Sequence, residues 1–291
     1  MDETIAAHGG WPIKQGKVMK INVPNINDLL GKMIHINVSF DGNQKTINEW
    51  LQEHRKMIKN NQKLIIRRSE ENDIKILISM LRDLLIRATK GERGNRVYEE
   101  LNKQVKGKDD LTEKCYKEVL KNASYRWGIK TGTQIISNVV DLFSKKLCWN
   151  WKKYFDDAER FKKTDFQQDE LLKIKHIGFK VRDLALSNFN CNYVANDLHV
   201  VRVMTRIGLL NYGFDMLTNR NLEMGNNPGN KKNYLFLHRL VLKLSSFTNS
   251  EYSPADLDRI FWSFGKSICG NKPKCYNCPI NAQCLTGQNR I

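Results

Sequence analysis

The sequence predicts a mainly α-helical protein with a small strand-bearing extension at its N-terminus. Apolar residues recur at helical spacing along most of the chain after residue 46, whereas residues 1–45 include stretches of alternating apolar and polar residues. A length of 291 residues with 41% hydrophobic residues allows a substantial core in one or two domains. No apolar run approaches the ~20 residues that a membrane-spanning helix needs, so we expect no membrane partner.

The N-terminal extension, residues 1–45, is expected to form short strands or a partly disordered arm. Its segment KMIHINVSFDGNQ alternates apolar and polar residues and contains β-branched side chains. Asp41-Gly42 within this segment is a turn signal typical of β-hairpins. A strand pair closed at this turn is therefore the structure that we expect.

Helical segments follow one another from residue 47 to residue 166. Ile47, Leu51 and Ile58 fall on one face of the first of them. The sequence Thr89-Lys90-Gly91 indicates a break within the second. The expected segments are 47–58, 74–101 in one or two helices, one helix within 102–125, 125–143, and an aromatic and lysine-rich segment at 147–166.

The stretch from Asp169 to Val203 predicts a helix, a tight hairpin, a second helix and then a third. His176-Ile177-Gly178 is too short for a flexible loop and ends in a glycine suited to a sharp reversal. The second helix begins near Phe179, which places Lys180 in its first turn. The first helix, from Asp169 to the hairpin, has its apolar side at Leu171, Leu172 and Ile174.

Asp197 directly precedes the third helix of this stretch. Leu198, Val201 and Met204 follow it at the spacing of a buried helical face. Taken alone, an aspartate here is a helix N-cap and Lys180 is one more solvated lysine. Because both stand at helix starts, however, the fold can bring them into one cleft.

Beyond Met204 the chain is expected to form a long loop, one apolar helix and a final capped helix. The polar segment NYGFDMLTNRNLEMGNNPGNKK contains Gly and Pro and is long enough to be either functional or disordered. The segment YLFLHRLVLKLSSF then reads as a strongly apolar helix. Ser253 and Pro254 provide a cap and a first-turn proline for the last helix, expected at 255–268.

Four of the seven cysteines lie within sixteen residues, in ICGNKPKCYNCPINAQC. Zinc is one interpretation, although structural zinc sites usually show two close pairs with a longer spacer. A single compact loop of four thiolates suits a [4Fe–4S] cluster better. Disulfides are a third and weaker interpretation, because no signal peptide is recognisable at the N-terminus. The cysteines that would hold the cluster are Cys269, Cys275, Cys278 and Cys284.

The hairpin with its lysine, the aspartate in NDLHVVRV and the four-cysteine loop occur in this order in a known family. Over residues 47–291 the chain resembles the endonuclease III group of DNA glycosylases, of the helix-hairpin-helix superfamily. Trp127-Gly128-Ile129 belongs to the likeness, and residues 74–101 resemble the mismatch thymine/uracil glycosylases. The resemblance implies a two-domain helical glycosylase fold with a DNA cleft between the domains. The implied domains are a six-helix barrel at 74–204 and an iron–sulfur cluster domain at 46–73 and 205–291.

Two features depart from the pattern of that group. Five residues separate the first two cysteines here, where the group usually has six. The hairpin of the group usually reads Leu-Pro-Gly-Val-Gly, whereas Lys175 and His176 replace the proline and the first glycine in this chain. The second departure affects how the hairpin would bind DNA more than it affects the catalytic step.

The resemblance also implies a role for each matching residue. Lys180 would be the nucleophile of a bifunctional glycosylase and AP lyase, and Asp197 would stabilise the positively charged sugar. Arg87 and Ile129 would fill the gap left by a flipped base. The residues expected to contact the DNA backbone are Lys175, His176, Ile177 and Gly178 in the hairpin and Lys272 and Lys274 in the cysteine loop.

The charge of the chain agrees with a nucleic-acid partner. Lys and Arg number 48 against 31 Asp and Glu, a formal charge of +17, which is typical of proteins that bind a polyanion. We expect a monomer that excises a damaged, mismatched or modified base, with pyrimidines favoured, from double-stranded DNA in the cytoplasm (at the nucleoid) or in the nucleus. Three alternatives stay open: an inactive lesion or mismatch reader, an enzyme for a modified cytosine or guanine, and a zinc-dependent nucleic-acid-binding protein.

Overall fold

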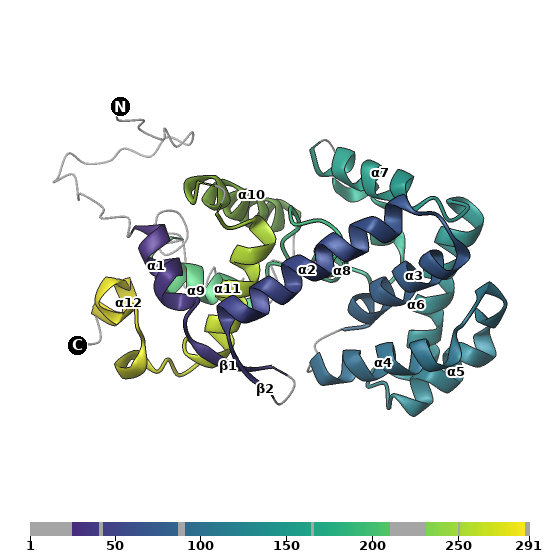
Figure 1. Ribbon diagram of the computed structural model, residues 1–291, viewed down its shortest axis with the longest axis horizontal. Coiled ribbons are helices and arrows are strands. Elements are labelled where there is room, and N and C mark those ends of the chain that lie inside the picture. Colours follow the sequence, from purple (N-terminus) through teal and green to yellow (C-terminus); the bar gives the residue numbers. More distant parts are fainter. Residues whose placement is uncertain are drawn as a thin grey trace.

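The computed structural model describes residues 25–40, 43–86, 91–163, 166–209, 231–249 and 251–288, and these residues are mostly helical (Figure 1). In chain order the longer elements are α1 (Ile26–Met33), β1 (Asn37–Phe40), β2 (Asn43–Thr46), α2 (Ile47–Ile66), α3 (Glu70–Leu84), α4 (Gly91–Gln104), α5 (Glu113–Asn122), α6 (Ile129–Asp141), α7 (Trp151–Lys163), α8 (Phe179–Leu186), α9 (Leu198–Arg206), α10 (Lys231–Phe247), α11 (Pro254–Ser267) and α12 (Leu285–Gln288). Short 3₁₀ turns lie at Lys108–Asp110, Phe166–Gln168, Glu170–Lys173, Cys275–Asn277 and Asn281–Gln283, and a π-helical turn at Leu142–Lys146.

Two separate hydrophobic cores divide the molecule into two domains. The first core consists of buried apolar side chains between residues 74 and 193. The second combines side chains from residues 29–51 with others from residues 194–284. Figure 1 shows the two corresponding groups of helices at opposite ends of the long axis. The fold is therefore the two-domain helical arrangement that the sequence predicts. Within the described residues, no helix is both long and apolar enough to span a membrane.

Helix α2 connects the two cores. Ile47 and Leu51, near its start, are buried in the second core, and Leu64 and Ile65, near its end, pack against the first. The guanidinium of Arg55, at the middle of the helix, binds both carboxylate oxygens of Asp256 on α11 at 3.0–3.2 Å. Figure 1 shows α2 running diagonally between the two groups of helices.

The predicted strand pair is present near the N-terminus. Strands β1 and β2 pair antiparallel, with Asn37 opposite Thr46 and Phe40 opposite Asn43. The expected turn at Asp41-Gly42 joins them but lies outside the described residues, as do residues 1–24. Helix α1 precedes the strands and was not predicted. Its residues Leu29, Leu30 and Met33 are fully buried in the second core.

Capping residues set the starts of the predicted helices α2 and α11. The Thr46 hydroxyl accepts from the backbone N–H of Glu49, and the Glu49 carboxylate accepts from the backbone N–H of Thr46. Ser253 and Asp256 make the same reciprocal pair before α11, with Pro254 in the first turn. Each box satisfies two backbone donors that a helix start leaves unpaired. Residues 210–230 of the expected loop, and the expected break at Thr89-Lys90, lie outside the described residues.

The prediction of an α-helix before the hairpin, beginning at Asp169, is wrong. Residues 170–173 form a 3₁₀ turn, in which the backbone N–H of Ile174 donates to Leu171 O at 3.1 Å. The Asp169 side chain accepts from the backbone N–H of Leu171 at 2.9 Å. Such local capping favours the tighter i→i+3 turn, and the segment is too short to continue as an α-helix.

Candidate active site and cysteine loop

The hairpin before α8 reverses the chain at His176. This residue has a φ of +78°, in the left-handed region, where the endonuclease III group places glycine. A side chain in this conformation costs roughly 1–2 kcal/mol relative to glycine. Ile177 is buried and its backbone N–H donates to Ile174 O at 3.1 Å, and Gly178 then caps α8. The hairpin therefore has the expected sharp reversal despite the substituted glycine.

Lys180 and Asp197 meet at the starts of α8 and α9. The Lys180 Nζ lies 3.4 Å from Asp197 Oδ2. The Lys180 side chain is 46% exposed, whereas that of Asp197 is 8% exposed. Lys180 is the second residue of α8, where the positive end of the helix dipole disfavours a positive charge. The pair thus places an accessible amine directly beside a shielded carboxylate.

Asp197 is held in one orientation by the helix that it caps. Its Oδ1 accepts from the backbone N–H groups of His199 at 2.8 Å and of Val200 at 3.1 Å. These bonds occupy one carboxylate oxygen and leave Oδ2 toward Lys180. The structural role of an N-cap and the chemical role of a carboxylate are therefore divided between the two oxygen atoms.

A buried charge network connects α8 to the segment before the hairpin and to α10. The guanidinium of Arg182 is 1% exposed and pairs with Asp169 at 3.3 Å and with Asp183 at 2.9 Å. Tyr234, from α10, donates its hydroxyl to Asp183 and also to Val194 O. Burial raises the pKa of Asp183 to about 6, and the charge of Arg182 opposes that rise. These contacts hold α8, which carries Lys180, in a fixed position relative to the segment before the hairpin and to α10.

The expected wedge residues lie in the first domain or outside the described chain. Ile129 opens α6 and is 38% exposed, and Arg87 lies outside the described residues. Trp127, two residues before Ile129, is equally exposed and carries the Arg126 guanidinium 5.2 Å from its ring centroid. The intervening Gly128 has a φ of +85°, which turns the chain sharply at this point. Trp127 was not predicted as a site residue, and its exposure is a property of the fold that the sequence does not display.

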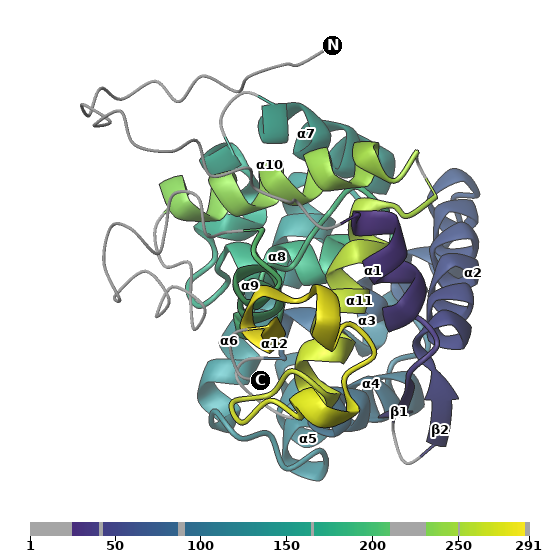
Figure 2. The ribbon, with the colours of Figure 1, turned by 90° about the vertical axis from the view of Figure 1, so that its left-hand side faces the viewer.

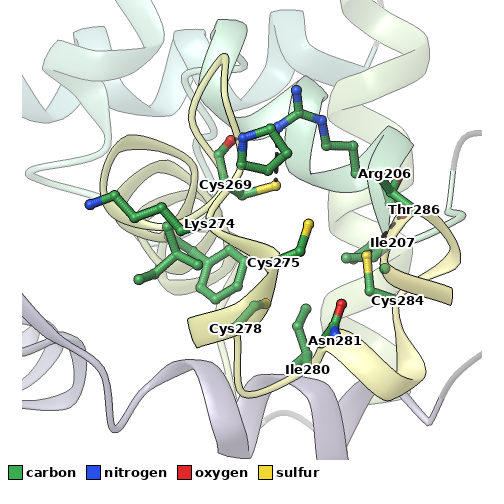
Figure 3. A pocket seen from close by; sticks show the side chains of 14 residues that line it. Arg206, Ile207, Cys269, Lys274, Cys275, Cys278, Ile280, Asn281, Cys284 and Thr286 are labelled. Carbon is green, nitrogen blue, oxygen red and sulfur yellow. Dashed lines mark hydrogen bonds between the residues drawn. The ribbon is translucent and has the colours of Figure 1, made fainter. Parts of the chain in front are cut away.

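The four cysteines of the C-terminal loop surround one space (Figure 3). All four thiols are free, and together they line one pocket. Cys269 and Cys284 are buried, and Cys275 and Cys278 are half-buried. Figure 2 shows this C-terminal segment in front of α9 and α11.

Arg206, at the end of α9, fastens the cysteine loop to the domain. Its Nη1 donates to Cys269 O at 3.0 Å and lies 3.4 Å from Cys269 Sγ. Its Nη2 donates to Asn271 O at 3.3 Å, and the Cys284 thiol donates to Arg206 O at 3.2 Å. Since Asp197 caps the other end of α9, one helix joins the Lys180–Asp197 pair to the cysteine loop.

The thiols have the chemistry of a ligand set. Burial raises the pKa of Cys278 to about 11 and also raises the pKa of Cys284, with the neighbouring cysteines adding to both shifts. The backbone N–H of Ile280 points at Cys278, and those of Thr286 and Gly287 point at Cys284. A bound cation offsets this kind of thiolate repulsion. Among the described residues, no three His, Cys, Asp or Glu side chains are gathered closely enough to hold a single metal ion.

Lys272 and Lys274 are exposed on the cysteine loop, and the Lys274 amine points away from the sulfur atoms (Figure 3). Tyr276, between Cys275 and Cys278, is 100% exposed. It was not predicted as a site residue. The loop thus presents two amines and one aromatic ring outward while its thiols face inward.

Two of the solved structures that are similar to this chain are as follows. The crystal structure of Methanocaldococcus jannaschii 8-oxoguanine DNA glycosylase has a TM-score of 0.50 and 16% identity, over 75% of this chain and 88% of that one. The structure of a trapped endonuclease III–DNA covalent intermediate, an estranged-adenine complex, has a TM-score of 0.49 and 18% identity, over 82% of this chain and 97% of that one. No protein-family model and no curated protein sequence matches the chain. At such identities the likeness concerns the fold, and the chain has the fold of the helix-hairpin-helix DNA glycosylases.

Proposed function

We propose that this protein is a base excision DNA glycosylase with AP lyase activity. The observation that carries the proposal is the pair of Lys180 Nζ and Asp197 Oδ2, 3.4 Å apart at two helix starts beside the hairpin. The shared fold with an 8-oxoguanine DNA glycosylase supports the same class of reaction. The excess of basic residues, +17 overall, supports a DNA partner. We propose that a monomer acts on double-stranded DNA.

Two side chains divide the chemistry between them. A base inside a duplex is out of reach, so the nucleotide is first flipped into the protein. Asp197, ionised, stabilises the positive charge that develops on the sugar as the glycosidic bond breaks. The neutral amine of Lys180 bonds to C1′, and the base leaves with the electron pair of the glycosidic bond. Loss of an amine proton and cleavage of the C1′–O4′ bond then open the sugar to an imine, with O4′ becoming a hydroxyl group. Removal of a C2′ proton from this imine expels the 3′ phosphate.

The candidate DNA contacts lie on the hairpin next to Lys180 and on the outer side of the cysteine loop. The backbone N–H of Gly178, at the start of α8, suits a phosphate; that of Ile177 donates to Ile174 O, so Ile177 would contribute by shaping the turn. Lys175 and His176 add positive or polar groups at the same turn, and Lys272 and Lys274 do so on the cysteine loop. Exposed aromatic rings stack well on unpaired bases, so we add Trp127 and Tyr276 to the candidate contacts. The wedge would consist of Arg87 and Ile129.

We propose that Cys269, Cys275, Cys278 and Cys284 hold a [4Fe–4S] cluster. The four thiols line one pocket. A single compact loop of four cysteines suits this cluster better than zinc, whose structural sites usually show two close pairs with a longer spacer. When bound, the cluster stabilises the loop, because metal-binding energy is folding energy in such segments. The loop then presents Lys272 and Lys274 in a fixed orientation.

The purified protein is expected to contain about four iron and four sulfide ions per chain. Cys278→Ser should lose iron and unfold at a lower temperature, because one ligand of the group is missing. Cys115→Ser is the matched control, since Cys115 is also half-buried but lies outside the loop. Metal analysis and thermal unfolding measure both effects. Stoichiometric zinc with little iron would contradict the assignment.

To identify the base that the protein removes, we propose a panel of duplexes, each carrying one altered base. The panel contains uracil and thymine opposite guanine, oxidised pyrimidines, modified cytosines and 8-oxoguanine. We expect base release from at least one of them, with pyrimidines favoured, and strand cleavage without added alkali. Tight binding without release from any lesion would instead identify an inactive reader, the alternative that the altered hairpin favours.

A further inference from the structure

Helix α1 precedes the part of the chain that resembles the endonuclease III group, yet it lies beside the cysteine loop. Its fully buried apolar residues, which belong to the second core, are Leu29, Leu30 and Met33. The same core includes Cys269 and Cys284. Figures 1 and 2 both show α1 next to the C-terminal segment that carries the cysteines. The N-terminal extension is therefore built into the surroundings of the cysteine loop.

The polar side of α1 makes a closed set of hydrogen bonds with that loop. Lys32 Nζ donates to Gln283 Oε1 at 3.0 Å and to Asp28 Oδ2 at 3.1 Å. The Gln283 amide donates to the same oxygen of Asp28. Each of the three side chains therefore contacts the other two, across 251 and 255 positions of the chain.

The structure of α1 makes this contact more restrained than an ordinary surface pair. Lys32 and Asp28 are 41% and 42% exposed, and an isolated ion pair at such exposure contributes little. Here both side chains stand one turn apart on a helix whose other side is buried and whose start is capped by Asn25. Because the backbone that carries them is already fixed, less conformational freedom is lost when they bind Gln283.

Gln283 immediately precedes the last cysteine of the loop. It ends the 3₁₀ turn Asn281–Gln283, and Cys284 follows. The backbone N–H groups of Gln283 and Cys284 both donate to Ile280 O, at 3.0 and 2.9 Å, and Ile280 is buried. A contact that restrains the Gln283 side chain therefore restrains Cys284 as well. Arg206 holds the opposite end of the loop.

We propose that α1 is a clamp that holds the turn before Cys284 in place and thereby slows the release of iron from the cysteine loop. The inference rests on the cluster assigned above and on no other part of the proposed function. Iron leaves such a loop only when a thiolate moves away, so the loop has to open locally. Opening at Cys284 breaks the bonds between Gln283 and α1, and these bonds therefore favour the closed loop.

The test is the rate at which the purified holoprotein releases iron to an excess of chelator, measured from the absorbance of the iron chelate. Gln283→Ala removes both bonds between the loop and α1 and keeps the four cysteines and the buried side of α1. We expect this variant to release iron about 3–10-fold faster than the wild type, because two hydrogen bonds of modest net strength are lost. Asp28→Ala removes one of these bonds and should give a smaller increase.

A double variant shows whether the effect passes through the contact itself. In Asp28→Ala combined with Gln283→Ala, iron release should be no faster than in Gln283→Ala alone, because the shared bond is already lost. Gln288→Ala is the matched control within the C-terminal segment, where Gln288 donates to Ala282 O at 2.8 Å. Any effect of Gln288→Ala should multiply with that of Asp28→Ala, since the two side chains act independently.

A control in the N-terminal extension completes the design. Lys45→Ala breaks the 2.6 Å ion pair with Glu53 on α2 and should leave the release rate unchanged. An increase as large as that of Gln283→Ala would overturn the inference, because any loosening of the extension would then have the same effect. Equal rates in Gln283→Ala and the wild type would also overturn it, as would multiplied effects in the double variant.

The outcomes also distinguish this inference from the proposed function. Protein purified without iron would overturn the cluster assignment and the clamp with it. The covalent adduct expected at Lys180 is a separate measurement, and its absence would overturn the proposed activity while leaving the clamp in place.

Discussion

Lys180→Ala is expected to abolish the covalent protein–DNA adduct that borohydride forms with an abasic or damaged nucleotide. Borohydride traps only an imine, and an imine at C1′ requires an amine within bonding reach. Lys180 supplies the amine nearest Asp197, at 3.4 Å from its carboxylate. The side chain is 46% exposed, so its removal uncovers little apolar surface, and Asp197 keeps the backbone N–H groups of His199 and Val200 as partners. The variant should therefore keep its melting temperature and much of its affinity for DNA.

Two neighbouring lysines serve as controls for this prediction. Lys173 is held by Glu170 at 2.8 Å, and Lys175 is exposed at the hairpin. Lys173→Ala and Lys175→Ala should both retain the adduct, although Lys175→Ala is expected to weaken binding to DNA. An adduct that survives in Lys180→Ala and disappears in Lys175→Ala would move the nucleophile to the hairpin.

Asp197→Asn is expected to slow base release by about 10²–10³-fold, the usual effect of losing one preorganised electrostatic partner. An asparagine oxygen can still accept from the backbone N–H groups of His199 and Val200, so the start of α9 should persist. Trapping on a pre-formed abasic site should suffer less, because the base has already left. Comparing the two rates in single turnover isolates the step at which the charge acts.

Asp197→Ala separates the cap from the charge. It removes both carboxylate oxygens, and the lost cap should destabilise the protein by about 1 kcal/mol. The asparagine variant should lack that loss in thermal unfolding while sharing the defect in base release. Equal rates of base release in Asp197→Asn and the wild type would show that Asp197 is only a helix cap.

Structural features that depend on residues close together in the sequence were predictable from it. The start of α8 follows from the glycine of the hairpin, that of α9 from apolar periodicity, and that of α11 from Ser253-Pro254. The cysteine loop is compact because its four members lie within sixteen residues. Local patterns of this kind depend on backbone capping and on helical period, which a single sequence displays directly.

Features set by distant contacts were not predictable. Helix α1 is stabilised by burial of Leu29 and Leu30 against a core completed more than 150 residues later. The link between Arg206 and the cysteine loop joins residues more than sixty positions apart. Burial is a property of the assembled fold, and no spacing along the chain encodes it.

Helix α2 bears on which partner would bend in the proposed complex with DNA. Its 20 residues form a rod of roughly 30 Å, embedded in one core at each end and tied to α11 at its middle by Arg55. Smooth bending of a 20–30 bp duplex costs on the order of 1–6 kcal/mol. For the DNA binding proposed above, a rod of constant length between the two domains would leave most of the bending to the duplex. A lesion that weakens base stacking would lower this elastic cost, so discrimination would begin with the stiffness of the DNA, before any base enters the protein.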